Sequence, residues 1–194
     1  MEHFENLLPF SGEAYYFPAV FAQTEREKYF NSLCDEIKWK QEPIKLFGKE
    51  IMQPRLTAWY GDPGKPYTYS GTTMQPMEWT KDLLEIKLAV EKLSHVHFTS
   101  ALLNLYRDGK DSMGWHRDNE KMLGPAPVIA SASFGGERTF QFRNYTDKSI
   151  ARSIDLQPGS ILIMRGATQQ HWEHRIPKTT RISNTRINIT FRII

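Results

Sequence analysis

The second half of the chain is a series of short strand-like stretches, and this restricts the folds that it can adopt. Six stretches rich in β-branched and aromatic residues follow residue 100, and turn pairs such as Asp108-Gly109 and Pro158-Gly159 separate them. Many short strands at regular spacing favour a sandwich or jelly roll over a parallel α/β sheet. The six predicted strands cover residues 101–107, 128–134, 138–143, 153–157, 160–164 and 186–193.

Two helices are expected before this region. Thr24 and Glu27 fit a capping box, and apolar residues then recur at helical spacing up to Trp39. A second helix is predicted to follow Thr80. The apolar positions are Phe30, Leu33 and Ile37 in the first helix and Leu83, Ile86, Val90 and Leu93 in the second.

Prolines and glycines interrupt the stretch between the two predicted helices. Within it, residues 51–52 and 56–60 fit short strands joined by turns. The chain has no repeat, low-complexity tract or linker, so we expect residues 1–194 to form a single domain. The predicted fold class is therefore mostly β with flanking helices.

The sequence argues against secretion and against a membrane span. Cys34 is the one cysteine, which rules out an internal disulfide and suits a reducing compartment. We expect it to be a small buried residue on the first helix. No apolar run approaches the roughly 18 residues that a membrane span needs, and the acidic N-terminus does not resemble a secretory signal.

Charge is distributed unevenly along the chain. Residues 138–194 contain ten Lys or Arg against three acidic residues, a net charge of +7. The first 137 residues contain 15 basic and 19 acidic residues, a net charge of −4. Such asymmetry points to a polyanionic partner, although a solvated basic face would give the same composition.

A histidine and a carboxylate stand two residues apart, at His116 and Asp118. On a strand, residues at i and i+2 point to the same face, so both side chains can converge on one ion. Two histidines and one carboxylate, with open coordination positions, are typical of a non-haem Fe(II) oxygenase. His-X-Asp by itself is a weak pattern that often arises by chance, so a third ligand is required.

The remaining histidines are the candidates for that ligand. His3 lies near the terminus, and His95 and His97 follow the second predicted helix, where surface or core roles are favoured. His171 and His174 are left. Three residues apart on an extended segment, they would face opposite sides, so at most one can join the metal. Spacing alone does not choose between them.

The last predicted strand alternates polar and apolar residues without a break over residues 186–193. Its polar face could point to water, or it could turn inward, where two arginines would grip a dicarboxylate. Guanidinium groups match carboxylates bidentately, which explains arginine rather than lysine in that role. Asn104 and Tyr106 share one face of an earlier strand and could add neutral hydrogen bonds. The polar face carries Arg186, Asn188, Thr190 and Arg192.

Together these residues resemble the AlkB family of nucleic-acid demethylating dioxygenases. The resemblance extends from about Phe47 to Arg192, agrees in order and spacing, and is closest to the subfamilies that act on methylated bases in DNA. Asn119 departs from the pattern, because closely related sequences often have Asp there, and this concerns lesion preference. The motifs are Pro54-Arg55-Leu56-Thr57-Ala58-Trp59-Tyr60-Gly61, Tyr67-Thr68-Tyr69-Ser70-Gly71, Asn104-Leu105-Tyr106, Gly114-Trp115-His116-Arg117-Asp118-Asn119-Glu120, Ser133-Phe134-Gly135, His174-Arg175-Ile176-Pro177-Lys178 and Arg186-Ile187-Asn188-Ile189-Thr190-Phe191-Arg192.

The resemblance implies both a fold and a reaction. The fold is a double-stranded β-helix of jelly-roll type over about residues 100–194, with N-terminal helices and a nucleotide-recognition lid over about residues 40–75. The reaction is oxidative demethylation of 1-methyladenine and 3-methylcytosine in DNA, which consumes 2-oxoglutarate and O2 at an Fe(II) centre. It releases formaldehyde and succinate and restores the base.

Metal and cosubstrate residues follow from their positions in the motifs. The resemblance implies that His116, Asp118 and His174 bind Fe(II), which selects His174 over His171. It implies no further catalytic acid or base. The implied 2-oxoglutarate contacts are Arg186 for the distal carboxylate, Arg192 for the carboxylate near the metal, and Asn104, Tyr106, Asn188 and Thr190 around them.

The implied substrate is a base flipped out of the helix. Tyr69 and His116 would stack on it, and Glu120 would read the exocyclic amine of a cationic lesion. Phe47 would belong to a hairpin finger that fills the gap in a duplex, with core packing as its alternative role. The other predicted substrate contacts are Tyr67, Gly48, Lys49 and Arg55.

Two other functions stay open. An oxygenase of the same chemistry could act on RNA or on a protein side chain, and a nucleic-acid-binding module without catalysis could keep the same fold. We expect a monomer that acts on alkylated DNA, single-stranded or duplex, or on RNA. It would lie in the cytoplasm of a bacterium or in the nucleus of a eukaryote. Candidates for phosphate contacts are Lys45, Lys49, Arg55, Arg117, Arg138, Arg143 and Lys178.

Overall fold

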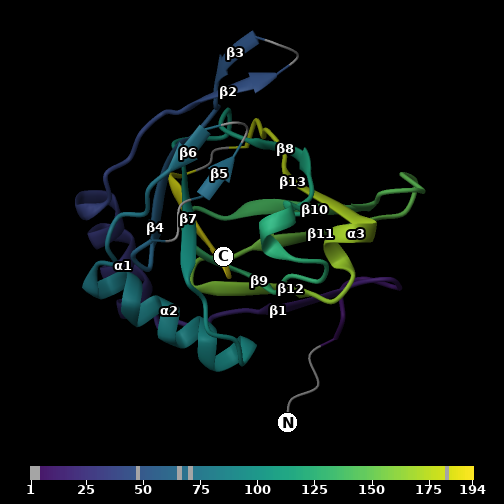
Figure 1. The fold of residues 1–194 in the computed structure, drawn as a ribbon. Coiled ribbons are helices and arrows are strands. Elements are labelled where there is room, and N and C mark those ends of the chain that lie inside the picture. Colours follow the sequence, from purple (N-terminus) through teal and green to yellow (C-terminus); the bar gives the residue numbers. More distant parts are fainter. Residues whose placement is uncertain (1–4, 47–48, 65–66, 70–71, 182–183) are drawn as a thin grey trace.

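The computed structural model of the chain describes residues 5–46, 49–64, 67–69, 72–181 and 184–194. Its main strands form a six-stranded and a four-stranded sheet, whose neighbouring strands are all antiparallel (Figure 1). One apolar core, which includes Phe142, Met164 and Trp172, lies between the two sheets. The predicted jelly-roll class is confirmed.

Strand order is not chain order, as expected for a double-stranded β-helix. Each predicted strand after residue 100 is present in one of the two sheets. The six-stranded sheet has the order β1 (Glu13–Phe17), β12 (Ser160–Arg165), β9 (Ile129–Gly135), β14 (Arg186–Arg192), β7 (Ser100–Tyr106) and β4 (Leu56–Gly61). The four-stranded sheet has the order β11 (Ala151–Leu156), β10 (Arg138–Asn144), β13 (Trp172–Ile176) and β8 (Met113–His116).

The alternating strand β14 lies in the middle of the larger sheet, between β9 and β7. Its apolar residues Ile187, Ile189 and Phe191 are fully buried against the helices. Its polar residues Arg186 and Arg192 are 0% and 3% exposed on the opposite face, between the sheets. The polar face therefore points inward, as the second of the two interpretations of this strand requires, and the binding of a dicarboxylate there stays a prediction.

Two helices cover the outer face of the six-stranded sheet (Figure 1). The helix α2 (Lys81–Ser94) begins as predicted, because the Thr80 hydroxyl oxygen accepts a hydrogen bond from the Leu83 amide at 3.3 Å. Its apolar stripe packs on the sheet together with that of α1 (Gln23–Glu36). The fully buried members of the two stripes include Leu33, Leu83, Ile86 and Val90.

The start of α1 was predicted wrongly. Its N-cap is Ala22, and the Glu25 carboxylate accepts a hydrogen bond from the Ala22 amide at 2.9 Å. The capping box expected at Thr24 is therefore displaced by two residues, because Glu25 rather than Glu27 reaches back to the first turn. Cys34 lies on this helix as a partly buried free thiol.

Two small hairpins lie in the region predicted as a lid. One consists of β2 (Pro43–Leu46) and β3 (Lys49–Met52), and it stands away from both sheets (Figure 1). The other consists of β5 (Tyr67–Tyr69) and β6 (Thr72–Met74). The strands predicted at 51–52 and 56–60 fall within β3 and β4.

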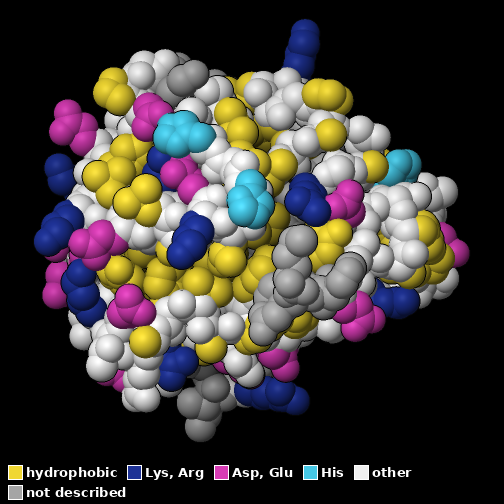
Figure 2. Space-filling model, turned by 90° about the horizontal axis from the view of Figure 1, so that it is seen from below, with side chains coloured by type: hydrophobic (Ala, Val, Ile, Leu, Met, Phe, Trp, Pro, Cys, Tyr) yellow, Lys and Arg dark blue, Asp and Glu magenta, His cyan; other side chains and the backbone are white. Residues whose placement is uncertain are grey.

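The N-terminal side of the molecule carries a band of hydrophobic side chains with acidic and basic residues around it (Figure 2). Charges of opposite sign pair on the helices, where Lys28 lies 2.9 Å from Asp82 and 3.0 Å from Glu85. A surface of mixed sign is poorly suited to a polyanion. In the described ranges, no helix is long and apolar enough to cross a membrane.

Candidate metal centre

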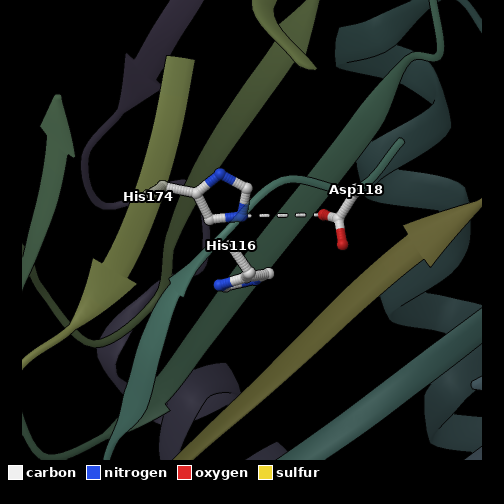
Figure 3. A group of neighbouring side chains, drawn as sticks. All are labelled: His116, Asp118 and His174. Atoms are coloured by element: carbon white, nitrogen blue, oxygen red, sulfur yellow. Dashed lines mark ion pairs between the residues drawn. The ribbon is translucent and has the colours of Figure 1, made fainter. Parts of the chain in front are cut away.

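Three side chains form a metal-binding group, two of them on neighbouring strands and the third just beyond the end of one of these strands. His116 ends β8, Asp118 follows two residues later, and His174 lies in the centre of β13. The strands pair with His116 opposite His174, which puts the two ring centroids 4.2 Å apart. His174 Nε2 is 3.7 Å from Asp118 Oδ2, and one ligand atom from each residue lies within 4.8 Å of the others (Figure 3). This set matches a facial triad of two imidazoles and one carboxylate.

Burial and a neighbouring charge give the three groups the protonation states that a cation requires. Burial and the neighbouring His116 lower the pKa of His174 to about 3, so this imidazole is neutral at pH 7. Burial also lowers the pKa of His116. Burial raises the pKa of the Asp118 carboxyl, but the charge of Arg192 and its hydrogen bond to the carboxylate oppose this, and the pKa lies below its ordinary value. The group thus offers two neutral nitrogens and one carboxylate, which are the forms that bind metals.

His171 is outside this group. It is exposed and ends the short helix α3 (Thr168–His171), and β13 begins only at Trp172. The expectation that His171 and His174 share one extended segment was wrong, because a helical turn intervenes. The structure brings His174 to the metal-binding group and leaves His171 on the surface.

A buried arginine, Arg186, contacts Asn188, and Asn188 lines the pocket beside the metal-binding group. Arg186 is 0% exposed, and its Nη2 donates to Ser133 Oγ at 3.0 Å and to Asn188 Oδ1 at 2.9 Å. Its Nε and Nη1 have no partner among the described residues. Burial lowers the pKa of Arg186 to about 10, so it stays charged at neutral pH. A buried cation with unsatisfied donors fits an anionic ligand such as a carboxylate, which would supply an acceptor.

Arg192 lies on the same inner face. Its Nη2 donates to Asp118 Oδ1 at 2.7 Å, so this guanidinium is next to the metal-binding group. The strands β14 and β7 pair with Arg186 opposite Tyr106 and with Asn188 opposite Asn104. One pocket is lined by the metal-binding group together with Asn104, Tyr106, Asn188, Thr190 and Arg192.

Arg55 is buried rather than available at the surface. It is 3% exposed, and it donates to Asn104 Oδ1 at 2.7 Å through Nε and to the Ser112 carbonyl at 3.4 Å through Nη1. Arg138 is also 3% exposed, and its guanidinium donates to backbone carbonyls. These two arginines therefore do not suit the surface phosphate contacts expected of them, and Arg55 instead contacts a residue of the pocket.

The predicted base contacts come from separate segments of the chain. Glu120 is half-buried and precedes the short 3₁₀ helix Lys121–Leu123, and the neighbouring Asn119 is exposed. Phe47 and Gly48 lie outside the described residues. Lys49 begins β3 and Tyr67 and Tyr69 bound β5, but the described part of these three residues is the backbone.

Three residues for which the sequence predicted no individual role support the site. Gln169 of α3 is 1% exposed, and its Oε1 accepts a hydrogen bond from the Asp118 amide at 2.9 Å. Ser131 and Ser133 of β9 face β14, and Ser131 Oγ donates to Asn188 Oδ1 at 2.7 Å. Two polar residues at i and i+2 on an otherwise apolar strand were a readable signal for the serines. Gln169 had none, because its short helix carries no periodic pattern.

Residues 13–192 match the family model of the 2OG-Fe(II) oxygenase superfamily. The matched range contains both sheets, the metal-binding group and the pocket. The chain belongs to that superfamily. Its metal is therefore Fe(II), and its cosubstrates are 2-oxoglutarate and O2.

The chain also belongs to the AlkB family. It is 43% identical over 187 residues to alpha-ketoglutarate-dependent dioxygenase alkB homolog 3 of Bos taurus, covering 91% of this chain and 64% of that protein. The human protein of the same name is 41% identical over 188 residues, covering 92% and 65%. DNA oxidative demethylase ALKBH2 of Mus musculus is 36% identical over 188 residues, covering 92% and 79%. The chain thus spans slightly less than two thirds of the alkB homolog 3 proteins.

The solved structure of OsALKBH1 has the same fold. It aligns with a TM-score of 0.66 at 15% sequence identity, covering 97% of this chain and 100% of that one. This agreement supports the double-stranded β-helix architecture and, at such low identity, carries nothing about substrate.

Proposed function

We propose that the chain removes methyl groups from N-alkylated bases in DNA, of the 1-methyladenine and 3-methylcytosine type, by direct oxidative reversal. The observation that carries this proposal is the presence of two features together. One is the His-Asp-His group, and the other is the buried Arg186, whose Nε and Nη1 lack partners among the described residues. The relatives favour DNA as the substrate, because the mouse protein matched over 79% of its length is named a DNA oxidative demethylase.

In this proposal the chain's own residues bind and orient the reactants. His116, Asp118 and His174 would hold Fe(II), and Arg186 and Arg192 would hold the two carboxylates of 2-oxoglutarate, Arg186 the distal one. With its cosubstrates bound, the iron centre supplies the oxidation that converts the N-methyl group to N-hydroxymethyl. That product loses formaldehyde without a protein acid or base, so positioning is the main task of the protein.

Selection of the lesion would fall to residues around the pocket. A flipped base would stack between Tyr69 and His116, with Tyr67 beside it. Glu120 would accept a hydrogen bond from the exocyclic amine, and its negative charge would favour the cationic lesions over the neutral normal bases. The segment from Phe47 to Lys49 would enter a duplex from the exposed β2–β3 hairpin.

The outer face of the four-stranded sheet supports a polyanionic substrate. Two guanidinium groups lie over the Trp115 ring, with Arg143 Cζ at 4.1 Å and Arg175 Cζ at 4.4 Å from its centroid. Arg117 stacks on Tyr145 at 3.7 Å. Trp115 and Arg117 flank His116 in the sequence, so this basic and aromatic surface adjoins the metal-binding group. We propose that a monomer binds DNA through it, either single-stranded or duplex.

The test is a repair assay with purified protein, Fe(II) and 2-oxoglutarate. Oligonucleotides carrying 1-methyladenine or 3-methylcytosine are supplied as single strands and as duplexes, and restored base and succinate are quantified. We expect repair by the wild type and none by His116→Ala. His171→Ala is the matched control, because it removes an exposed histidine that does not belong to the metal-binding group.

The same assay separates the alternatives. Succinate without repaired DNA would contradict the proposed substrate and direct the search to methylated RNA or a protein side chain. The absence of succinate from iron-loaded protein would reject catalysis and leave a nucleic-acid-binding module. Repair confined to duplexes would support a finger role for Phe47, which Phe47→Ala would then test.

A further inference from the structure

We propose that Gln169 is a positioning residue of the metal centre, which holds the main chain at Asp118 and thereby sets the direction of the Asp118 carboxylate. The proposal depends on the metal-binding group alone. It holds whether the substrate is DNA, RNA or protein.

The reason lies in the way β8 ends. The pairing of β8 with β13 ends at His116, opposite His174, and Asp118 lies two residues beyond this last pair. Asp118 is 3% exposed, so its amide can reach neither a strand partner in that ladder nor bulk water. A buried backbone N–H without an acceptor is strongly disfavoured. Gln169 Oε1 supplies the acceptor at 2.9 Å and is itself in a residue only 1% exposed.

Further contacts hold Gln169 and its helix in place. Gln169 Nε2 lies 3.6 Å from the sulfur of Met164 on β12, which fixes the orientation of the side-chain amide. The next residue, Gln170, accepts a hydrogen bond from Arg117 Nη1 at 3.0 Å through its backbone carbonyl. Its own Nε2 donates to the Pro125 carbonyl at 2.6 Å. The helix α3 is therefore tied to the segment around Asp118 at three points.

The chain order makes this connection relevant to the metal. α3 leads directly into β13, which carries His174. The segment to which α3 is hydrogen-bonded carries His116 and Asp118. Gln169 thus links the two ligand-bearing segments just beyond the point where their β-pairing stops.

The two ends of Asp118 are fixed by different partners. Arg192 Nη2 holds Oδ1 at 2.7 Å, and Gln169 holds the amide. With both in place, Oδ2 faces His174 Nε2 at 3.7 Å, within the group of ligand atoms. Without Gln169, the Asp118 main chain could turn toward another acceptor, and Oδ2 would leave this position.

The experiment is a titration of metal-free protein with Co²⁺, followed by the visible absorption of the bound ion. Removal of a group that orients a metal ligand typically weakens metal binding about 10- to 100-fold. We expect a loss of this size in Gln169→Leu, which removes the acceptor, and in Gln169→Asn, whose shorter side chain draws it away. Gln169→Glu keeps an acceptor oxygen in place. It should therefore bind Co²⁺ more tightly than Gln169→Asn.

Gln141→Leu is the matched control. Gln141 lies on the outer face of β10 and accepts a hydrogen bond from Arg175 Nε at 2.7 Å, so the same substitution there spares the metal-binding group. It should bind Co²⁺ with wild-type affinity. Circular dichroism and thermal unfolding establish that each variant is folded, and Gln169→Asn decides the outcome if Gln169→Leu does not fold.

Three results would overturn the proposal. Wild-type Co²⁺ affinity in folded Gln169→Leu or Gln169→Asn would show that the hydrogen bond does not position Asp118. An equal loss in Gln169→Glu would show that the acceptor oxygen is not the cause. An equal loss in Gln141→Leu would show that any buried or half-buried glutamine has the same effect. None of these readouts uses catalysis, so failure here is distinct from failure of the proposed demethylation.

Discussion

Arg186 illustrates how a single residue can serve function at the expense of stability. A guanidinium that is fully buried, with Nε and Nη1 lacking partners among the described residues, has lost hydration that its two remaining hydrogen bonds do not replace. A dicarboxylate ligand beside Arg186 would supply an acceptor and offset part of this cost. Removal of the charge should then stabilise the folded state when that ligand is absent.

We therefore expect Arg186→Met to raise the free energy of unfolding of the metal-free, cosubstrate-free protein by about 1–3 kcal/mol, measured in urea. The same variant should lose 2-oxoglutarate binding, measured by calorimetry in the presence of Mn²⁺. Arg192→Met is the contrasting variant. It breaks the buried ion pair with Asp118 and should destabilise the protein by about 3–5 kcal/mol. Destabilisation by Arg186→Met would refute this account of the residue.

At the scale of single elements, periodic patterns were predictable and contacts between elements were not. The strand β14 was predictable because its alternation is unbroken, and so was the start of α2 because Thr80 is a strong N-cap residue. The strands β8 and β13 were missed as separate strands, since runs of four and five residues are too short to show a period. Their pairing, which brings His116 opposite His174, is a long-range contact that no local pattern encodes.

The candidate site divides in the same way. Its ligand types could be found in the sequence, and its geometry could not. Asp118 was expected on the same strand as His116, but it lies beyond the end of β8, where Gln169 rather than a neighbouring strand satisfies its amide. The burial of Arg55 was equally hidden, because a motif gives the identity of a residue and not its exposure.

The turn at the end of β9 gives a test of the packing of one element. Gly135 has φ of +78° and lies opposite Arg186. A Cβ at this position would overlap the Thr185 carbonyl oxygen and the ring of Phe30. Gly135→Ala should therefore lower the free energy of unfolding by about 2–4 kcal/mol, measured in urea. Gly64→Ala is the control, because its φ of +74° is similar but nothing lies within 4 Å of the added Cβ, so a smaller loss is expected.

The turn between β7 and β8 gives a test of pH dependence. Asp111 is 5% exposed and accepts hydrogen bonds from the backbone and guanidinium of Arg107. Burial raises the pKa of the Asp111 carboxyl, but the contacts with Arg107 outweigh it and leave that pKa lowered. A lowered pKa in the folded state means stability that is present above the unfolded pKa of about 3.9 and lost as the pH falls below it.

Asp111→Asn should accordingly destabilise the protein by about 1–3 kcal/mol at pH 7, with a deficit that shrinks below about pH 4. Urea unfolding of wild type and variant across this range measures the difference. Asp35→Asn, on an exposed position of α1, should give no such trend. A deficit that is independent of pH would mean that the charge of Asp111 is not what stabilises the turn.

At the scale of the whole molecule, ligand binding and folding should be coupled. The metal-binding group and the pocket draw on both sheets, so their ligands bind the folded state and not the unfolded one. At about 100 times its dissociation constant, a ligand stabilises the folded state by about 2.7 kcal/mol. For a chain of this length, that corresponds to a rise in Tm of roughly 5–10 °C.

We expect this rise in Tm when Mn²⁺ and 2-oxoglutarate are added together, and differential scanning fluorimetry measures it. A chelator should reverse it. His116→Ala should show little or no shift, whereas His171→Ala should behave as the wild type. A wild-type Tm that is unchanged by both ligands would argue against the pocket as their site.

The central position of β14 has a consequence for how the enzyme matures. In the described part of the molecule this strand joins β1, β12 and β9 on one side to β7 and β4 on the other, and it is the last strand along the chain. It also carries Arg186 and Arg192, the two arginines that would bind the cosubstrate. A half-folded intermediate that already held iron would therefore lack the means to engage 2-oxoglutarate. Completion of the sheet and assembly of the 2-oxoglutarate pocket would then be one event, and an incompletely folded molecule would be unable to start the oxidation and damage itself.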